Sequence, residues 1–297
     1  MRTLSARSDG PAPYLSDVSS LQPRRHEVLI EVVAAAVNPI DVFVASGAAH
    51  PVFGLPALVG LGWDVAGRVA AIGPDVTDIA PGDLVAGLHD DLTLSTRTHA
   101  EQVVLPATSV AVVPPGVDEL AAASVPLNAL TALQALTPLG DGDGRTLLVT
   151  GAAGAVGGYA VALAAAAGWH VTGLGRAHDE AWVRGAGASG FVTAPQPAAY
   201  DVVFDTAVLN ALAVAAVRDG GQYVGVIPPA PPAPERGVSV SAVNVRADGS
   251  QLARLLARTA SGELEVRVAG TVALDHAGSA YEKLAGGGQR GRWLLVP

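Results

Sequence analysis

The segment that most constrains the fold is "LLVTGAAGAVGGYAVALAAAAG", residues 147–168. An apolar strand-like run ends at Thr150, and Gly151, Gly154 and Gly157 follow at three-residue spacing as an alanine-rich helical stretch begins. Because glycine has no Cβ, such a turn lets backbone N–H groups approach a pyrophosphate at the positive end of a helix. The segment therefore predicts a dinucleotide-binding turn. The expected cofactor contacts are Gly151, Ala153, Gly154, Ala155, Val156 and Gly157. The alternative is a tight turn in which glycine serves helix–strand packing alone.

The same region has no charged residue from Thr146 to Gly175. This exceeds the roughly 20 residues that a helix needs to cross a bilayer. However, the stretch consists mostly of Ala, Gly and Val, and glycine interrupts it at positions 151, 154, 157 and 158. We therefore predict a buried strand, a turn and a helix in place of a membrane span.

Strands and helices alternate through the second part of the chain. Apolar residues at helical spacing begin near residue 119 and are interrupted by Pro126. Strands are then expected at 146–150, 169–175, 190–193, 201–207, 222–227 and 238–245, and helices at 155–167, 179–187, 208–217 and 249–262. This alternation predicts a parallel sheet with helices on both faces. The proline-rich stretch 228–237 is expected to be a loop, and 291–297 a last strand.

Residues 1–120 have a different pattern. Runs rich in β-branched residues at 28–37, 63–73, 83–87 and 101–106 are separated by Gly and Pro turns. They predict a mainly β domain. The chain has 297 residues, of which 50% are hydrophobic and 15% charged. That is enough apolar material for two domains or one large α/β domain.

Charge and residue content exclude several functions. The net charge is −9 and there is no basic cluster, so a nucleic-acid partner is not expected. The chain has no cysteine, which excludes disulfides and thiolate metal sites. Residues 1–20 contain no apolar signal-peptide core, so a cytoplasmic location is expected.

The end of the second expected strand bears on cofactor choice. A carboxylate there would bind a free ribose 2′-hydroxyl and repel a 2′-phosphate. Here the strand ends in Gly175 and Arg176, with a guanidinium that suits a phosphate. NADPH is therefore the predicted cofactor, and the alternative is that Arg176 is an ordinary solvated loop arginine.

Several further blocks occur in a fixed order along nearly the whole chain. They are "VNPID" (37–41), "GWDVAGRVAAIG" (62–73), "PGDLVAG" (81–87), "HAEQVVLP" (99–106), "PLNALTALQAL" (126–136), "VTGAAGAVGG" (149–158), "DVVFDT" (201–206), "RDGGQYV" (218–224) and "GGGQRGRWLLVP" (286–297). The set resembles the medium-chain dehydrogenase/reductase superfamily, in its zinc-independent quinone oxidoreductase and enoyl reductase-like branch.

The resemblance implies an α/β architecture of two domains. A GroES-like, mainly β catalytic domain would comprise residues 1–120 and 247–297, and a Rossmann domain with a doubly wound parallel sheet would comprise residues 121–246. The cofactor and substrate would lie where the two domains meet. Zinc members have a cysteine ligand near position 38. Because this chain has none, no metal is expected.

The resemblance also assigns site residues. It implies that Asn38 lies beside the nicotinamide or the substrate carbonyl, where its amide can donate to an oxygen that gains charge. Thr131 would face the nicotinamide, and Val156 would pack against its ring. Each could instead be structural: Thr131 could bond back along its helix, and Val156 could be a core residue. We expect Asp41 to hold the turn through backbone hydrogen bonds.

This chain departs from the branch at two polar positions. Relatives often have a tyrosine where Phe43 stands and an arginine where Ala45 stands. His50 and His89 are the remaining titratable candidates nearby, and we interpret each as a surface-loop histidine. The proton that an enone requires is then free to come from solvent.

Three hypotheses remain open. The preferred one is an NADPH-dependent reductase that transfers hydride to an α,β-unsaturated carbonyl or a quinone. The second is non-redox chemistry, such as cyclisation or isomerisation, in the same apolar cleft, with or without bound NADPH. The third is a non-enzymatic NADPH-binding or structural protein. A small apolar molecule is the expected substrate, with no membrane partner. A homodimer is expected because strands near residues 221–245 form a sheet edge that can pair across a two-fold axis.

Overall fold

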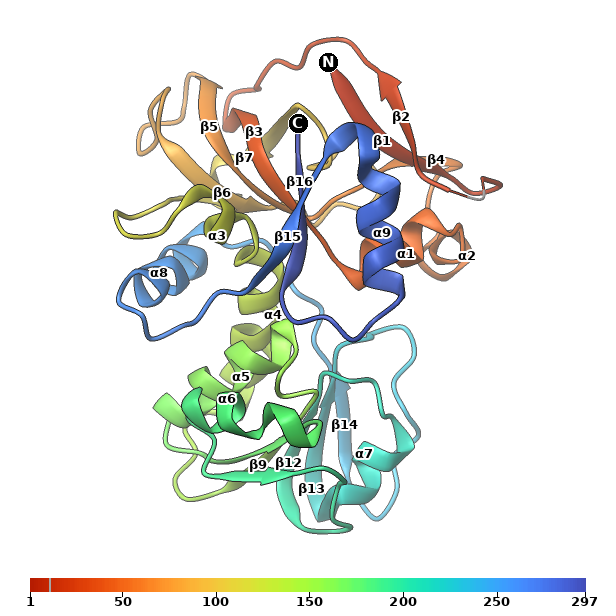
Figure 1. The fold of residues 1–297 in the computed structure, drawn as a ribbon, viewed down its shortest axis with the longest axis vertical. Helices are drawn as coiled ribbons and strands as arrows, with labels where there is room; N and C mark the ends of the chain where they lie inside the picture. The colour runs from red at the N-terminus through yellow and green to blue at the C-terminus, as the bar shows by residue number, and fades with distance from the viewer. Residues whose placement is uncertain (11) are drawn as a thin grey trace. The chain divides into compact units, whose positions relative to one another are not determined.

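The computed structural model describes residues 1–10 and 12–297. The chain divides into two compact units (Figure 1). Unit 1 comprises Met1–Leu127, Arg246–Ser261 and Val266–Pro297. Unit 2 comprises Asn128–Val245 and Gly262–Glu265. Each unit has its own core and is described by itself.

Unit 2 is built on a six-stranded sheet with the order β11-β10-β9-β12-β13-β14 (Figure 1). Its strands are β9 (Thr146–Thr150), β10 (His170–Leu174), β11 (Gly190–Val192), β12 (Tyr200–Asp205), β13 (Val217–Gly225) and β14 (Ser239–Ala242). Every neighbouring pair is parallel. The chain runs outward in one direction from β9 and in the other from β12, which is the doubly wound order. The parallel sheet predicted from the alternating pattern is confirmed.

Helices cover this sheet. They are α5 (Ala155–Ala166), α6 (Glu180–Gly185) and α7 (Ala211–Ala216), with the 3₁₀ turn η3 (Ala177–Asp179). Helix α4 (Pro126–Leu136) and the 3₁₀ turn η2 (Thr137–Leu139) precede β9 in the chain. Helix α5 contacts β9 and β10, α6 contacts β11, and α7 contacts β12 and β13. Because parallel crossovers are right-handed, the two directions of winding place α5 and α7 on opposite faces.

The expected helix at 208–217 is shorter than predicted, for a local reason. Val208 and Asn210 have φ of 57° and 53°, which a continuous helix does not allow. The N–H groups of Leu209 and Asn210 bond the Asp205 carboxylate instead. Helix α7 therefore begins at Ala211, and β13 starts at Val217, earlier than the expected strand.

Unit 1 contains a seven-stranded sheet whose main path is β15-β16-β3-β5-β6-β8. The strands are β3 (Glu27–Val37), β5 (Asp64–Ile72), β6 (Leu84–Leu88), β7 (Gln102–Pro106), β8 (Val110–Val112), β15 (Val268–Ala273) and β16 (Arg292–Val296). Long β3 pairs with β5 along one edge. Along the other edge it pairs with β7 in its first half and with β16 in its last three residues. The C-terminal strand thus completes the sheet of the N-terminal part.

A three-stranded antiparallel sheet of the order β2-β1-β4 completes unit 1, with β1 (Arg2–Arg7), β2 (Tyr14–Asp17) and β4 (Leu58–Gly60). The helices of unit 1 are α1 (Pro39–Ala45), α2 (Ala49–Phe53), α3 (Glu119–Ala123), α8 (Gly249–Ala260) and α9 (Ala277–Ala285), and its 3₁₀ turns are η1 (Ala107–Ser109) and η4 (Leu274–His276). One apolar core packs under α1 and α9, and another fills the sheet around β3 and β5. The unit is mainly β, as predicted.

The uncharged segment 146–175 forms β9, the glycine turn, α5 and β10. Within residues 1–10 and 12–297, no helix combines the length and apolar character that a bilayer span requires.

Candidate functional site

The glycine turn between β9 and α5 holds its three glycines in different settings. Gly151 has φ of 58°, in the left-handed region that favours glycine. A Cβ on Gly157 would lie 2.2 Å from the Gly151 carbonyl oxygen, so Gly157 is required by packing. Gly154 is exposed, and a Cβ there would meet only the Gly151 oxygen, at 3.0 Å. Gly154 is therefore the point at which a ligand can approach the backbone.

Helix α5 begins directly behind Gly154, which is its N-cap residue. No side chain caps this helix end, and its first turn contains no acidic residue. Ala155 and Val156 are partly exposed there, whereas Ala153 is buried. An uncapped N-terminus of a twelve-residue helix presents backbone N–H groups and a positive partial charge. The turn can bind an anion such as a pyrophosphate.

Arg176 lies at the same edge of the sheet. Leu174, at the end of β10, is in register with Thr150 at the end of β9, and its carbonyl accepts a hydrogen bond from Ala152 N at 3.0 Å. The strand ends therefore bring Gly175 beside the glycine turn, with Arg176 following it on the surface. The next carboxylate, Asp179, is 6% exposed, and its Oδ2 accepts from Arg176 N at 3.1 Å. Arg176 is thus exposed to solvent, whereas the Asp179 carboxylate accepts a backbone hydrogen bond.

Asp205 orders the neighbouring strand ends. Its fully buried carboxylate accepts from Thr150 Oγ1 at 2.6 Å and from Tyr223 Oη at 3.0 Å. The N–H groups of Leu209 and Asn210 donate to it at 3.1 and 2.8 Å. One carboxylate thus ties together β9, β12, β13 and the loop after β12. Burial and the Asp205 charge raise the pKa of Tyr223, so its hydroxyl stays protonated.

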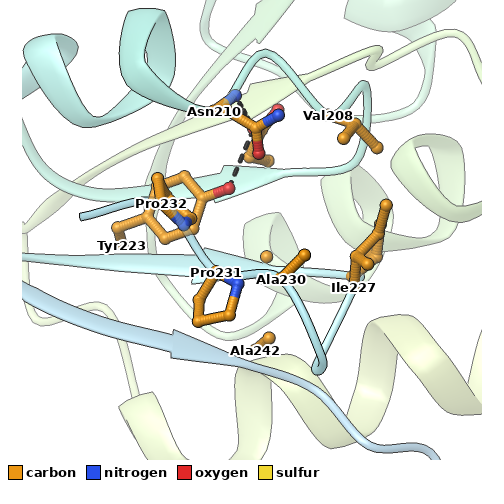
Figure 2. A pocket seen from close by; sticks show the side chains of 11 residues that line it. Val208, Asn210, Tyr223, Ile227, Ala230, Pro231, Pro232 and Ala242 are labelled. Atoms are coloured by element: carbon orange, nitrogen blue, oxygen red, sulfur yellow. Dashed lines mark hydrogen bonds between the residues drawn. The ribbon is translucent and has the colours of Figure 1, made fainter. Parts of the chain in front are cut away.

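A pocket opens over these strand ends (Figure 2). Its free volume is about 10 Å³, which is room for about one water molecule. The lining comes from the loop after β12, from the end of β13, from the proline-rich loop and from Ala242 of β14. The Tyr223 hydroxyl is held by its bond to Asp205, and Figure 2 shows Val208 and Ile227 across the pocket from Tyr223. Ligands of doubly wound sheets bind at such carboxyl ends of the strands.

In unit 1, Asn38 and Asp41 form a buried polar turn. Asp41 Oδ2 accepts from Asn38 N at 2.8 Å, and its Oδ1 accepts from Gly62 N at 3.0 Å. Asp41 therefore holds the turn through backbone hydrogen bonds, as predicted. Pro39 starts helix α1 where the sequence indicated only a turn.

The Asn38 side chain is fully buried and has a partner that sequence reasoning missed. Its Nδ2 donates to Asp64 Oδ2 at 2.6 Å and, at 3.4 Å, to the Ala36 carbonyl oxygen. Asp64 Oδ1 accepts from Leu127 N at 2.5 Å. Burial outweighs these hydrogen bonds and raises the pKa of Asp64 to about 7. The short bond to Asp64 therefore fixes the orientation of the Asn38 amide.

The two histidine candidates are buried, so their interpretation as surface-loop residues is wrong. His50 lies in α2 and His89 directly follows β6, and each is 5% exposed. Burial, followed by the Arg97 charge, lowers the pKa of His89 to about 3. His89 is therefore uncharged at neutral pH. His50 Nδ1 lies 3.2 Å from the Gly47 carbonyl oxygen, so Nδ1 is its donor nitrogen.

The remaining predicted positions are placed as follows. Phe43 is 36% exposed and packs edge to face against Phe53, with ring centroids 6.4 Å apart, whereas Ala45 is buried. Thr131 lies in the middle of α4 and is 7% exposed. Asn38 belongs to unit 1, whereas Thr131, the glycine turn and Arg176 belong to unit 2. Within unit 2, the structure brings the glycine turn and Arg176 together.

The chain matches two known protein families. The Alcohol dehydrogenase GroES-like domain matches residues 24–115, and the Zinc-binding dehydrogenase family matches residues 179–295. The first match lies in the β-rich unit 1, and the second runs from the doubly wound unit 2 into the C-terminal part of unit 1. The chain belongs to the medium-chain dehydrogenase/reductase superfamily. Its α/β fold, with a GroES-like domain and a Rossmann-like parallel sheet, is that of the superfamily.

Several relatives within the medium-chain dehydrogenase/reductase superfamily are named as reductases or oxidoreductases. A chloroplastic quinone-oxidoreductase homolog of Spinacia oleracea is 34% identical over 178 residues, covering 58% of this chain and 54% of that protein. A 2-methylene-furan-3-one reductase of Solanum lycopersicum is 28% identical over 300 residues, covering 95% of this chain and 74% of that protein. The solved quinone oxidoreductase of Coxiella burnetii has the same fold, with a TM-score of 0.83 and 24% identity over 100% of this chain and 99% of that one. The chain spans about half the length of the first curated relatives it matches.

Zinc does not fit the side chains that unit 1 offers. The chain has no cysteine. Across the described part of the chain, no group of three or more His, Asp or Glu side chains is arranged to hold a metal ion. Asn38 and Asp64 bond each other, and His99 is held between Tyr281 Oη and the Ala36 carbonyl. No step through a metal is derived for this member of the superfamily.

Proposed function

We propose that the chain is an NADPH-dependent, zinc-independent reductase that transfers hydride to an α,β-unsaturated carbonyl compound or a quinone. The observation that supports this most is the uncapped N-terminus of α5 behind exposed Gly154, at the carboxyl end of a parallel strand. The quinone oxidoreductase and furanone reductase relatives support the reaction class.

The residues that would hold the cofactor lie along one edge of the unit 2 sheet. The turn from Gly151 to Gly157 would bind the pyrophosphate, and Arg176 would bind the 2′-phosphate. Val156 and Thr131 would face the nicotinamide. When bound, the cofactor supplies the hydride. The exposed Arg176, with Asp179 turned to the backbone, supports NADPH over NADH.

Asn38 would stabilise the oxygen that becomes negative during hydride transfer. Its Nδ2 has two hydrogens. The 2.6 Å bond to Asp64 fixes the amide plane. We propose that the second Nδ2 hydrogen turns to the substrate oxygen as that oxygen gains charge. Asp64 is thus a positioning residue. We propose that the proton comes from solvent, because His89, with a pKa of about 3, holds no acidic proton at neutral pH.

The test follows NADPH absorbance with simple enones and quinones, with NADH in parallel. We expect oxidation of NADPH in preference to NADH. The substitution Arg176→Ala should weaken NADPH binding by roughly 30-fold, the loss of a charge-assisted contact, and change NADH binding little. Arg184→Ala is the matched control, because Arg184 is exposed in the same unit and its guanidinium contacts Glu180. Arg184→Ala should affect neither cofactor.

Two outcomes would contradict the proposal in different ways. Equal losses for both cofactors in the Arg176 variant would refute the NADPH assignment and leave the reductase. Failure to oxidise either cofactor with any enone or quinone would refute the reductase in favour of non-redox chemistry, such as cyclisation or isomerisation.

We further propose that the enzyme is a cytoplasmic homodimer that pairs through β14. This strand is an edge of the parallel sheet, and Ser239 and Ser241 on it are exposed. An open edge offers unpaired backbone groups to a second copy.

A further inference from the structure

Arg97 is a buried cation with few partners. Its side chain lies in unit 1 and is 0% exposed. Its Nη2 donates to the His89 carbonyl oxygen at 2.6 Å, whereas Nε and Nη1 have no hydrogen-bond partner among the described residues. Its guanidinium carbon stacks 4.9 Å from the ring centroid of Trp63. Four of the five N–H donors of the guanidinium are thus left to something else.

The carboxylates nearest to Arg97 are used elsewhere. The charges of Asp41, Asp90 and Asp91 all act on Arg97, yet none is within ion-pair distance in the described structure. Asp41 accepts from Asn38 N and Gly62 N. Asp90 accepts from Ala247 N, and Asp91 from Thr93. Each of these carboxylates is held by backbone N–H groups, so none can turn to Arg97 without breaking a bond.

This arrangement is costly unless an anion completes it. Burial lowers the pKa of Arg97 to about 10, which leaves it charged at neutral pH. Buried charges in proteins are normally paired and hydrogen-bonded, because a lone one forfeits its hydration. Trp63 Nε1 and Thr98 Oγ1 are also buried without partners. Two residues beside Arg97, its stacking partner Trp63 and its chain neighbour Thr98, thus also have unsatisfied polar atoms.

We propose that Arg97 is the receptor for a carboxylate carried by the substrate. This rests on the proposed reductase function, because the group that is reduced would lie near Asn38 in the same unit. The two are linked through Asp41, which bonds Asn38 N and whose charge acts on Arg97. A permanent anion fits better than the enolate oxygen of the reaction, since the buried charge exists before turnover begins. The planar guanidinium fork matches a carboxylate in two parallel bonds.

The carboxylate reaches Arg97 when the loop of residues 90–96 shifts. This loop contains no helix or strand, and Asp91, Thr93, Leu94 and Ser95 on it are exposed. Its ties to the rest of unit 1 include Ala247 N to Asp90 and Gly60 N to the Leu94 carbonyl. Ser95 also packs against Gly60, and Leu92 packs on the apolar core under α1 and α9, so local opening of these contacts is part of the proposed binding step.

The experiment compares two enones that differ in one group. They are 3-penten-2-one, which is neutral, and 4-oxopent-2-enoate, in which a carboxylate replaces the terminal methyl group. We expect the wild type to favour the carboxylated enone in kcat/KM by about 30-fold or more. Arg97→Met should abolish this ratio, and Arg97→Lys should retain part of it. Arg68→Met is the matched control, an exposed arginine of the same unit that pairs with Glu119, and it should keep the ratio.

A second readout does not depend on turnover. The saturated acid 4-oxopentanoate should raise the melting temperature of the wild type by mass action, and 2-pentanone should not. Arg97→Met should abolish the shift. Without ligand, Arg97→Met should melt at or above the wild-type temperature, because it removes an unpaired buried charge. A residue that merely holds the fold together would give a large fall.

The outcomes separate this proposal from the reductase function. If both enones are reduced equally by the wild type, the reductase stands and the carboxylate site is overturned. If neither enone is reduced while 4-oxopentanoate stabilises the wild type and not Arg97→Met, the site stands and the reductase is overturned. If Arg97→Met lowers the melting temperature strongly and 4-oxopentanoate does not stabilise the wild type, Arg97 is structural. Should Arg97→Met not fold, the two wild-type measurements still decide.

Discussion

At the scale of single residues, Asp64 makes the stability of the protein depend on pH. Its pKa rises from 3.8 to about 7, chiefly because burial penalises the charged form. Between these values the folded state holds a proton that the unfolded state has lost. Unfolding therefore releases a proton, and the free energy of unfolding falls as pH rises from about 4 to about 7. About three pKa units correspond to an effect on the order of 4 kcal/mol.

The substitution Asp64→Asn should remove this dependence. Unfolding in denaturant, measured from pH 4.5 to 8, should show the wild type losing stability relative to the variant as pH rises, with no further relative loss above pH 8. Asp78→Asn, which changes an exposed carboxyl in the same unit, should follow the wild-type course. If wild type and Asp64→Asn run parallel over the whole range, Asp64 does not titrate as described.

Sequence could reveal some of these residues and not others. Asn38, Asp41 and the glycines belong to short patterns whose geometry is set by neighbours in the chain. Asp64 bonds Asn38 across 26 positions and Leu127 across 63, so its role follows from packing. Arg97 sits in the polar stretch "STRTHAEQ", which indicates an exposed loop. Only the stacking on Trp63 and the contact with His89 show that it is buried.

At the scale of elements, two substitutions in the glycine turn distinguish a glycine required for packing from one required for cofactor binding. Gly157→Ala should destabilise the fold by about 2 to 4 kcal/mol, since its Cβ would lie 2.2 Å from the Gly151 oxygen. Gly154→Ala should fold, because its φ of −76° suits any residue and its site is exposed. It should nevertheless weaken NADPH binding by about tenfold or more, since a methyl group would occupy the approach path.

Gly185→Ala is the control for both changes. Gly185 ends α6 in the same unit, and a Cβ there would meet nothing within 4 Å. It should change neither stability nor cofactor binding beyond a small gain from helix propensity. Thermal unfolding and titration of NADPH fluorescence measure the two effects. Normal NADPH affinity in Gly154→Ala would show that the cofactor does not approach the backbone at this turn.

Elements with a strong local pattern were predicted, and weakly patterned ones were missed. Strands β9, β10 and β12 are apolar runs bounded by turn residues, and α5 follows a glycine turn. Strands β1, β2 and β4 are short and depend on pairing with one another, for example Ser5 with Gly60 across the chain. Helix α7 was predicted too long because the Asp205 carboxylate captures N–H groups that a helix would otherwise use.

At the scale of the whole molecule, the fold class could be predicted because each unit repeats one pattern. Alternating strands and helices lead to a parallel sheet, and strands separated by Gly and Pro lead to a mainly β unit. The pairing of the C-terminal strand with the N-terminal part of unit 1 is harder to predict from the sequence pattern. Strand β16 pairs with β3, with Trp293 opposite Val37, and no local signal specifies that register. Family resemblance supplied that expectation, because the order of motifs along the chain reflects the complete architecture.

The proposed homodimer depends on which backbone groups of β14 face outward. Val243 N donates to Gly225 O of β13. Because successive residues of a strand point their N–H groups to opposite sides, Val240 and Ala242 direct theirs away from β13. A second copy of β14 would bond these groups across a two-fold axis. Val240→Pro removes one outward donor while leaving the side that pairs with β13 intact.

Sedimentation at micromolar concentration should therefore give a dimer for the wild type and a folded monomer for Val240→Pro. Val240→Thr keeps the N–H group and the branched shape, so it should remain dimeric. A wild-type mass of 29.7 kDa, that of one chain, would refute the homodimer outright. A dimer that persists in Val240→Pro would place the interface on another surface.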